Sequence, residues 1–266
     1  MGATARWVDV DGLRIGYRRQ GQGDPLLLLH GGFSDSREWR AQLDGRCDEY
    51  DVIAVDSPGC GGSSDPPDGF TLRDYAEVLA GFLDVLEVEH PHVGGLSFGS
   101  TYALLLYRHH ATIPRSLILA GAYAGWVGSL PATEVARRVQ WIKDVLDRPV
   151  AEWGRDFLAT AYGKSTPPAV LAEAMEILRD VRRDGFRRIA EAFLYADLRE
   201  VLPLVTVPTL LLYGERDERS PMPVALDLQA RIRGSRLAVL SGAGHSVNTE
   251  VPVQFNTAVR AFLSSL

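Results

Sequence analysis

The distribution of apolar residues divides the chain into short strand-like runs and longer helix-like ones. Apolar runs at 25–29, 51–55 and 209–213 are typical of strands covered on both faces of a sheet. Residues 71–86 instead repeat their apolar positions at helical spacing, with Thr71 as the predicted N-cap. The two kinds of run alternate, which predicts an α/β fold with a mostly parallel central sheet and helices on both faces.

The alternation continues along most of the chain. Its remaining elements are strands at 91–95, 116–120 and 236–240, and helices at 97–110, 223–232 and 252–263. Near the start, two β-rich runs at 7–10 and 13–17 flank Asp11 and Gly12, a pair that suits a tight type I′ turn. The sequence therefore predicts a β-hairpin before the first buried strand.

The middle of the chain, residues 123–200, shows no convincing strand pattern. Its apolar positions predict helices, at 134–146, 151–161 and 169–183. Basic and acidic residues balance there, so the net charge of −6 belongs to the rest of the chain. We therefore expect one α/β core, residues 1–122 and 201–266, interrupted by a helical insertion. A length of 266 residues suits one large domain of this kind.

Composition narrows the possible partners and the cellular location. With 28 basic and 34 acidic residues, the chain lacks the basic excess that nucleic-acid binding needs. Its two cysteines, Cys47 and Cys60, cannot form a disulfide framework, which favours a reducing compartment. No apolar run approaches the roughly 20 residues that span a bilayer, and residues 1–6 lack an apolar signal core. We expect a cytoplasmic protein with no nucleic-acid or membrane partner.

The strongest chemical signal is Gly95-Leu96-Ser97-Phe98-Gly99, a G-x-S-x-G motif between a predicted strand and a predicted helix. A serine on so sharp a turn has a strained backbone, so small neighbours are needed on both sides. The turn raises the hydroxyl above the sheet, and the N-terminus of the helix points toward any oxyanion that develops there. This context predicts that Ser97 is a nucleophile.

A serine hydroxyl is a poor nucleophile unless a neighbouring base accepts its proton. His245 lies in the Gly-rich segment 242–246 after the last predicted strand, at the same sheet edge as Ser97. Four other histidines precede the strand of Ser97 at its far end or end its helix, and are interpreted as surface or structural residues: His90, His92, His109 and His110. The predicted base is therefore His245.

The third catalytic residue should be a carboxylate that holds the imidazole in its productive tautomer. Asp217 follows the strand at 209–213 at the same edge, with Glu215 and Glu218 as alternatives nearby. The segment after the preceding strand, 116–131, contains no acidic residue. The predicted order along the chain is Ser97, Asp217, His245.

Over nearly its full length the chain resembles the α/β-hydrolase superfamily, whose triad has this order. The resemblance rests on the motifs already described and on two further segments: Leu29-His30-Gly31-Gly32-Phe33 and Asp56-Ser57-Pro58-Gly59-Cys60-Gly61-Gly62-Ser63-Ser64. It implies that the N–H groups of Phe98 and of either Gly32 or Phe33 form the oxyanion hole. It also implies that His30 is structural and that residues 123–200 form a cap.

Residues 123–200 are rich in aromatic side chains, most of which are expected to form the core of the predicted helices. The resemblance implies that a few line an apolar pocket over Ser97. The expected pocket residues are Trp126, Trp141 and Tyr195, with Trp126 the strongest candidate because it follows a strand end closely. A neutral, aromatic cap suggests a small, largely apolar substrate.

No cofactor or metal is expected. The glycines within 56–64 suggest a nucleotide loop, but the dinucleotide pattern would need glycine at Ser64 and a helix opening directly there. The chain has neither an H-E-x-x-H motif nor paired C-x-x-C motifs, and His90 and His92 lack further ligands nearby.

These observations predict a serine hydrolase that cleaves an ester, lactone or related activated carbonyl through an acyl-enzyme on Ser97. Its residues 97–101 are also similar to those of carbon–carbon bond hydrolases and proline iminopeptidases, although Phe33 departs from the loop pattern of both. The alternatives are therefore one of those enzymes, or a non-hydrolytic ligand-binding or lyase member of the same fold. The oligomeric state is not predicted.

Overall fold

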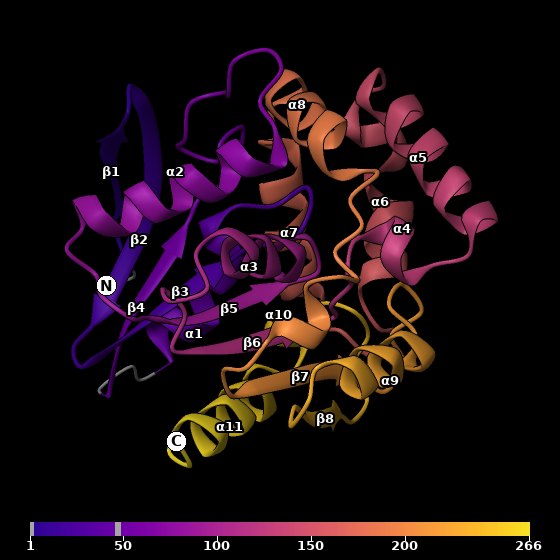
Figure 1. Cartoon of the computed structure of the whole chain (residues 1–266). Helices are drawn as coiled ribbons and strands as arrows, with labels where there is room; N and C mark the ends of the chain where they lie inside the picture. The colour runs from indigo at the N-terminus through magenta and orange to yellow at the C-terminus, as the bar shows by residue number, and fades with distance from the viewer. Residues whose placement is uncertain (1–2, 46–48) are drawn as a thin grey trace.

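The computed structural model, which describes residues 3–45 and 49–266, contains an eight-stranded sheet (Figure 1). Its strands are β1 (Ala5–Val10), β2 (Leu13–Gly21), β3 (Asp24–Leu29), β4 (Tyr50–Val55), β5 (His92–Leu96), β6 (Ser116–Ala120), β7 (Thr209–Gly214) and β8 (Arg236–Leu240). They lie in the order β1-β2-β4-β3-β5-β6-β7-β8, and β2 alone pairs antiparallel with its neighbours. The predicted mostly parallel sheet is confirmed. Cys47, Met1 and Gly2 lie outside the described residues.

The sheet is buried on both faces, as its unbroken apolar strands predict. In β3, Leu27 and Leu29 belong to one hydrophobic cluster, whereas Leu26 and Leu28 belong to another. The first cluster includes α2 (Leu72–Val85), α3 (Phe98–His109) and α9 (Met222–Arg231). The second includes α1 (Arg40–Asp44), α10 (Val247–Glu250) and α11 (Pro252–Leu263). Helices therefore cover both faces.

The predicted turn at Asp11 and Gly12 and the predicted helix cap at Thr71 are both present. Asp11 and Gly12 have φ of 50° and 82°, and they join β1 to β2 in the predicted hairpin. At the start of α2, the Thr71 hydroxyl accepts from the Asp74 N–H at 3.3 Å, and the Asp74 carboxylate accepts from the Thr71 N–H at 2.8 Å. This capping box satisfies N–H groups that the helix itself leaves unpaired.

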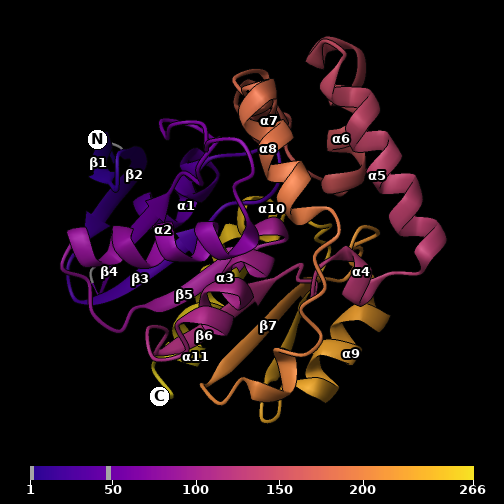
Figure 2. The ribbon, with the colours of Figure 1, turned by 45° about the horizontal axis from the view of Figure 1, so that its top comes forward.

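Between β6 and β7, the regular elements of the described residues are all helical: α4 (Trp126–Ser129), α5 (Ala132–Leu146), α6 (Val150–Ala161), α7 (Pro168–Arg179), α8 (Arg183–Phe193) and the short η2 (Leu202–Leu204). We call residues 123–200 the helical insertion. Figures 1 and 2 show α5 to α8 grouped at one end of the sheet and not over either of its faces.

The single helix predicted at 169–183 is wrong, because α7 ends at Arg179 and α8 begins at Arg183. The break has a tertiary cause. The Arg182 guanidinium donates to the carbonyls of Gly61 and Ser63 and to Asp65, in the Gly-rich loop of the core. Contacts of this kind between distant segments override local helical periodicity. The short helices η1 (Ser36–Trp39), α1, α4, η2 (Leu202–Leu204) and α10 were not predicted either.

An aromatic cluster joins the helical insertion to the core. The Phe33 ring comes from the loop after β3 and stacks on Phe186 at a centroid separation of 3.9 Å. Three further rings of the insertion pack around it: Trp141, Trp153 and Phe157. Each such pair adds roughly 0.5–1.5 kcal/mol beyond the burial of its area. The insertion is therefore packed around a ring that the core supplies.

No helix among the described residues combines the length and the apolar character that crossing a membrane requires.

Candidate active site

Ser97 occupies the sharp turn between β5 and α3. Its backbone has φ of +52° and ψ of −109°, a region that residues other than glycine rarely adopt. The flanking glycines are needed for space. A Cβ atom on Gly95 would lie 2.3 Å from the backbone of Gly99, and one on Gly99 would lie 2.1 Å from the carbonyl oxygen of Leu29. The predicted reason for the G-x-S-x-G motif is therefore visible in the geometry.

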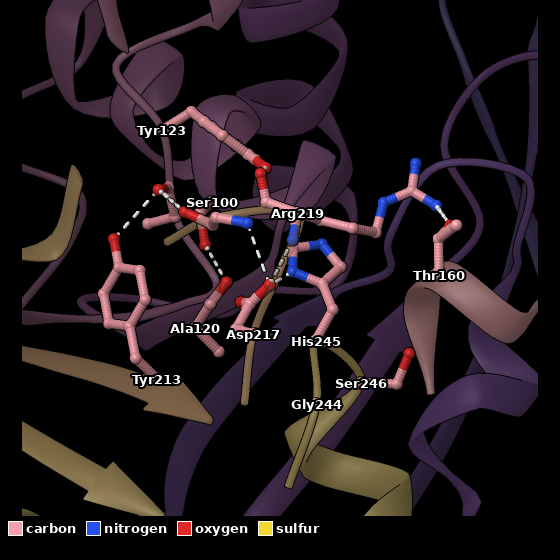
Figure 3. A network of polar contacts seen from close by, with 12 residues as sticks. Ser100, Ala120, Tyr123, Thr160, Tyr213, Asp217, Arg219, Gly244, His245 and Ser246 are labelled. Carbon is pink, nitrogen blue, oxygen red and sulfur yellow. Dashed lines mark hydrogen bonds and ion pairs between the residues drawn. The ribbon is translucent and has the colours of Figure 1, made fainter. Parts of the chain in front are cut away.

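Hydrogen bonds to the neighbouring strand hold this turn in place. The Ser97 N–H donates to the carbonyl of Ala120 at 2.8 Å. The buried Ser100 hydroxyl lies 2.6 Å from the carbonyl oxygen of Gly95 and 3.0 Å from that of Ala120 (Figure 3). The strained serine is thus fixed at the carboxyl ends of β5 and β6.

Asp217 and His245 form a hydrogen-bonded pair at the same edge (Figure 3). Nδ1 of His245 lies 2.8 Å from Oδ2 of Asp217, and both side chains are almost fully buried. Oδ1 of Asp217 accepts the backbone N–H groups of Arg219 and Ser220 at 2.9 and 2.8 Å. Because these donors favour a carboxylate, which can only accept, Nδ1 carries the proton of the neutral imidazole.

The other imidazole nitrogen, Nε2 of His245, is buried and has no hydrogen-bond partner among the described residues. Ser97 and His245 line one cavity. A buried polar atom without a partner is unusual, and this one belongs to a side chain that lines the cavity of Ser97. Nε2 is the acceptor in this tautomer, so it is suited to take a proton from a hydroxyl in the cavity.

Gly121, directly after β6, makes room for this pair. Its φ is +49°, and a Cβ atom there would lie 2.9 Å from Cε1 and 3.0 Å from Nδ1 of His245. The same Cβ would lie 3.5 Å from Oδ2 of Asp217. Gly121 is not among the residues predicted from the sequence. Its position directly after a predicted strand, at the sheet edge of Ser97, is the sequence feature that could have indicated its role.

The backbone of the histidine loop is held by the helical insertion. The N–H groups of His245 and Ser246 both donate to the carbonyl of Ala161, the last residue of α6, at 3.1 and 3.0 Å. The Glu250 carboxylate accepts from the N–H groups of Gly244 and Gly163 at 3.1 and 2.7 Å. The insertion therefore takes part in placing the imidazole, which its sequence pattern does not indicate.

The remaining candidates near the triad are placed elsewhere. Glu215 is exposed and accepts from the Ser241 hydroxyl and the Gly242 N–H, and Glu218 is also exposed. His30 is fully buried, with Nδ1 2.7 Å from the carbonyl oxygen of Gly31 and Nε2 accepting from the Ser57 N–H. The His30 ring is thus committed at both nitrogens to the backbone.

The residues expected to form the oxyanion hole surround the same cavity. Gly32, Phe33 and Phe98 all line it together with Ser97. Phe98 is the first residue of α3, where backbone N–H groups lack partners within the helix. Phe33 has a φ of +59°, which makes it the second strained residue of the cavity wall.

Glu38 supports this loop and was missed from the sequence. Its Oε2 accepts from the Gly31 N–H at 2.7 Å, and its side chain lies in the cavity wall. Burial raises the pKa of the Glu38 carboxyl to about 7. A single glutamate in a short loop gives no sequence signal of such burial.

The cavity has a volume of about 350 Å³, and most of its wall is apolar. Of the expected pocket residues, Trp126 lines it. Trp141 is not part of the wall; its ring packs behind the wall, against Phe33 and Phe157. Tyr195 is 61% exposed and lies outside the cavity, because it follows α8 in the segment that returns to the core. Tyr195 is therefore removed from the candidate pocket.

The glycines of the loop 56–64 have structural roles. Asp56 accepts from the N–H groups of Ser36 and Gly62, at 2.7 and 2.8 Å. A Cβ atom on Gly61 would lie 2.5 Å from this carboxylate, and one on Gly59 would lie 2.7 Å from the carbonyl oxygen of Gly185. Among residues 3–45 and 49–266, no group of three or more His, Cys, Asp or Glu side chains is arranged to hold a metal ion.

Comparisons with known proteins show the family of the chain. A model of the alpha/beta hydrolase family matches residues 26–258. The chain is 29% identical to 2-hydroxymuconate semialdehyde hydrolase from Pseudomonas sp. (strain CF600), covering 95% of this chain and 91% of that one. It is 26% identical to 3-oxoadipate enol-lactonase 1 from Acinetobacter baylyi, covering 88% and 86%. Among solved structures, a thermophilic esterase from Thermogutta terrifontis superposes with a TM-score of 0.87 at 25% identity, covering 99% of both chains.

Proposed function

The chain belongs to the alpha/beta hydrolase family, and we propose that it is a serine hydrolase of esters or lactones that acts through an acyl-enzyme on Ser97. One observation carries the proposal. The imidazole of His245 is held by Asp217 at Nδ1, while its buried Nε2 has no partner in the cavity that Ser97 also lines. An imidazole oriented by a carboxylate, with its other nitrogen unoccupied in the cavity of the serine, supplies the base that nucleophilic catalysis by serine needs.

In the proposed mechanism, Nε2 of His245 accepts the hydroxyl proton as the Ser97 oxygen attacks the substrate carbonyl. Asp217 stabilises the imidazolium that forms. The N–H group of Phe98 and that of Gly32 or Phe33 donate to the oxyanion. His245 then gives the proton to the leaving oxygen, and water hydrolyses the acyl-enzyme by the same steps with His245 as base.

We further propose that the helical insertion, residues 123–200, is a lid over this site. Support comes from the cavity itself, whose wall includes Trp126, Phe157 and Phe186 from the insertion as well as core residues. A volume of about 350 Å³ suits a small molecule, and the largely apolar wall suits a largely apolar acyl or alcohol group.

The relatives favour esters and lactones as the first substrates to test. One of those described above is named as an enol-lactonase and one as an esterase. A carbon–carbon bond hydrolase is the main alternative, and it is tested by offering a vinylogous diketone beside the ester and lactone substrates. A cytoplasmic location also stays a proposal, supported by the low cysteine content.

The experiment that tests the proposal is a burst assay with p-nitrophenyl acetate, followed by labelling with a fluorophosphonate probe. We expect the unaltered protein to release a burst of nitrophenolate and to be labelled at Ser97. The Ser97→Ala variant should show neither. A burst that persists in Ser97→Ala would exclude the acyl-enzyme at this residue, and the absence of labelling and turnover in the unaltered protein would favour a non-hydrolytic role.

A further inference from the structure

The charged side chains in the cavity wall differ in whether an opposite charge neutralises them. Arg37 forms ion pairs with Asp35 and Asp180 at 2.7 and 2.8 Å. Arg40 likewise pairs with Asp44 and Glu173, at 3.4 and 3.1 Å. These two cations are therefore already engaged with protein carboxylates.

Arg219 is the exception. It lines the cavity, and no carboxylate of residues 3–45 or 49–266 lies within ion-pair distance of its guanidinium. The guanidinium lies over the ring of Phe157 at 4.6 Å, and one of its nitrogens donates to the Thr160 hydroxyl at 3.0 Å. Figure 3 shows the side chain extending from the Asp217 loop toward Thr160 of α6. Most of its five N–H donors are thus available to a ligand.

Asp217, two residues before Arg219, acts on this cation through space but forms no ion pair with it, since its oxygens accept other hydrogen bonds. Asp217 accepts from the backbone N–H groups of Arg219 and Ser220 through one oxygen and from His245 through the other. The backbone of Arg219 is also fixed at its carbonyl, which accepts from the Tyr123 hydroxyl and from the Arg138 guanidinium. The position of the arginine is therefore set by the same loop that supplies the catalytic acid.

A cation held in an apolar wall without a counter-ion has a desolvation cost that a ligand anion can offset. Burial lowers the pKa of the Arg219 guanidinium, although a guanidinium stays protonated in proteins. Its planar fork matches the two oxygens of a carboxylate, and a bidentate pair of this kind is both directional and strong.

We propose that Arg219 binds a carboxylate of the substrate, so that the preferred substrates are esters or lactones that also carry a carboxylate group. This inference rests on the proposed hydrolase function and makes it more specific. A single free cation suits a monoanionic carboxylate better than a phosphate dianion, which usually needs several donors. The apolar remainder of the wall then contacts the hydrocarbon part of the same molecule.

The test uses two pairs of esters that differ only in one charge. In the first pair the carboxylate is on the acyl side: p-nitrophenyl hydrogen adipate and p-nitrophenyl methyl adipate. In the second it is on the leaving group: 4-carboxyphenyl butyrate and 4-(methoxycarbonyl)phenyl butyrate. Release of the phenol is measured for each, with the Ser97→Ala variant as background. Turnover of the neutral esters that depends on Ser97 tests the proposed function separately.

In at least one pair, we expect the unaltered protein to prefer the charged ester in kcat/KM. The Arg219→Gln variant should lower kcat/KM for that ester by about 10- to 100-fold and change the neutral ester by only a few-fold. Arg219→Lys keeps the charge without the fork and should restore part of the loss. Added NaCl should raise KM for the charged ester alone.

The matched control is Arg216→Gln, which removes the same charge from an exposed position on the same turn. It should leave the ratio between charged and neutral esters unchanged. Equal losses for both members of each pair in Arg219→Gln, or a preference of the unaltered protein for the neutral ester in both pairs, would overturn the assignment. If no ester is turned over and Ser97 is not labelled by the fluorophosphonate probe, the proposed hydrolase function is wrong, and the assignment of Arg219 that rests on it is wrong as well.

Discussion

The carboxyl edge of the sheet and the helical insertion hold their side chains in place by different means. At the sheet edge the constraints lie in the backbone: Ser97 has a positive φ, Gly121 leaves space for His245, and Asp217 accepts backbone N–H groups. In the insertion the constraints are contacts between side chains, mainly aromatic rings packed around Phe33.

This difference separates the proposed triad from the apolar part of the cavity wall. A backbone constraint fixes an atom closely, which catalysis needs. Side-chain packing instead tolerates exchange of one apolar residue for another of similar volume. We therefore expect substitutions to be tolerated better at Trp126, Phe157 and Phe186, which line the cavity from the insertion, than at the sheet edge.

The largest expected effect is at Ser97 itself. We expect Ser97→Ala to lower kcat by about 10⁴-fold or more, because the nucleophile is lost while the rest of the site is kept. Thermal unfolding should change little, since the alanine removes only one oxygen. A steady-state assay with p-nitrophenyl butyrate, combined with circular dichroism, checks both points. A residual rate above one tenth of the original would place the nucleophile elsewhere.

The second effect tests the packing of the insertion. Trp153 is 5% exposed, and its ring contacts Phe33, Trp141 and Phe157 without lining the cavity. Trp153→Ala should lower the free energy of unfolding by about 3 to 5 kcal/mol, because it leaves a cavity in this cluster. Denaturation by urea measures the change.

The matched control for that variant is Trp7→Ala, since Trp7 is 65% exposed on the edge strand β1. Its effect should stay within about 0.5 kcal/mol. Similar losses at the two tryptophans would show that the aromatic cluster does not hold the insertion to the core.

The third effect tests the backbone constraint at the catalytic edge. Gly121→Ala places a methyl group within 3.0 Å of His245 and adds the strain of a positive φ. We expect kcat/KM to fall by about 10²- to 10³-fold, because small displacements of a base cost this much. Gly234→Ala is the control, since Gly234 has a φ of +77° but nothing within 4 Å of its Cβ position. Strain alone should reduce stability there and leave kcat/KM unchanged.

The contrast between local backbone constraints and long-range side-chain contacts also explains which features the sequence could predict. Strand positions, the Thr71 cap and the strand–serine–helix turn follow from local patterns and simple sterics, and Asp217 could be chosen because acids are absent after β6. The end of α7 could not be predicted, because it depends on Arg182 reaching a distant loop.

The direction in which side chains of the insertion point could not be predicted from the sequence either. Aromatic content does not say which rings face the cavity, so Tyr195 is predicted to line the pocket together with Trp126, although only Trp126 of the two lines it. Arg219 and Glu38 gave no signal for a related reason. Whether an isolated charge is exposed or buried depends on the surfaces that close over it, and those surfaces come from the insertion as well as the core.

The smallest expected effect is a pH dependence of the free energy of unfolding, caused by Glu38 at the contact between the core and the insertion. Glu38 belongs to the core but influences the half-buried Tyr162 of the insertion electrostatically. Burial raises the pKa of Glu38 from 4.5 to about 7, so between these values the folded protein binds a proton that the unfolded chain has lost. The free energy of unfolding should therefore fall as pH rises from about 4.5 to about 7, by on the order of 3 kcal/mol from this group.

Glu38→Gln isolates that contribution, because glutamine keeps an acceptor for the Gly31 N–H and cannot ionise. Urea denaturation at pH 5 and pH 8 should show a smaller loss of stability in the variant than in the unaltered protein. The two should differ little at pH 5, where the folded protein already holds Glu38 neutral. An unchanged difference between the two pH values would mean that Glu38 is solvated in the folded protein.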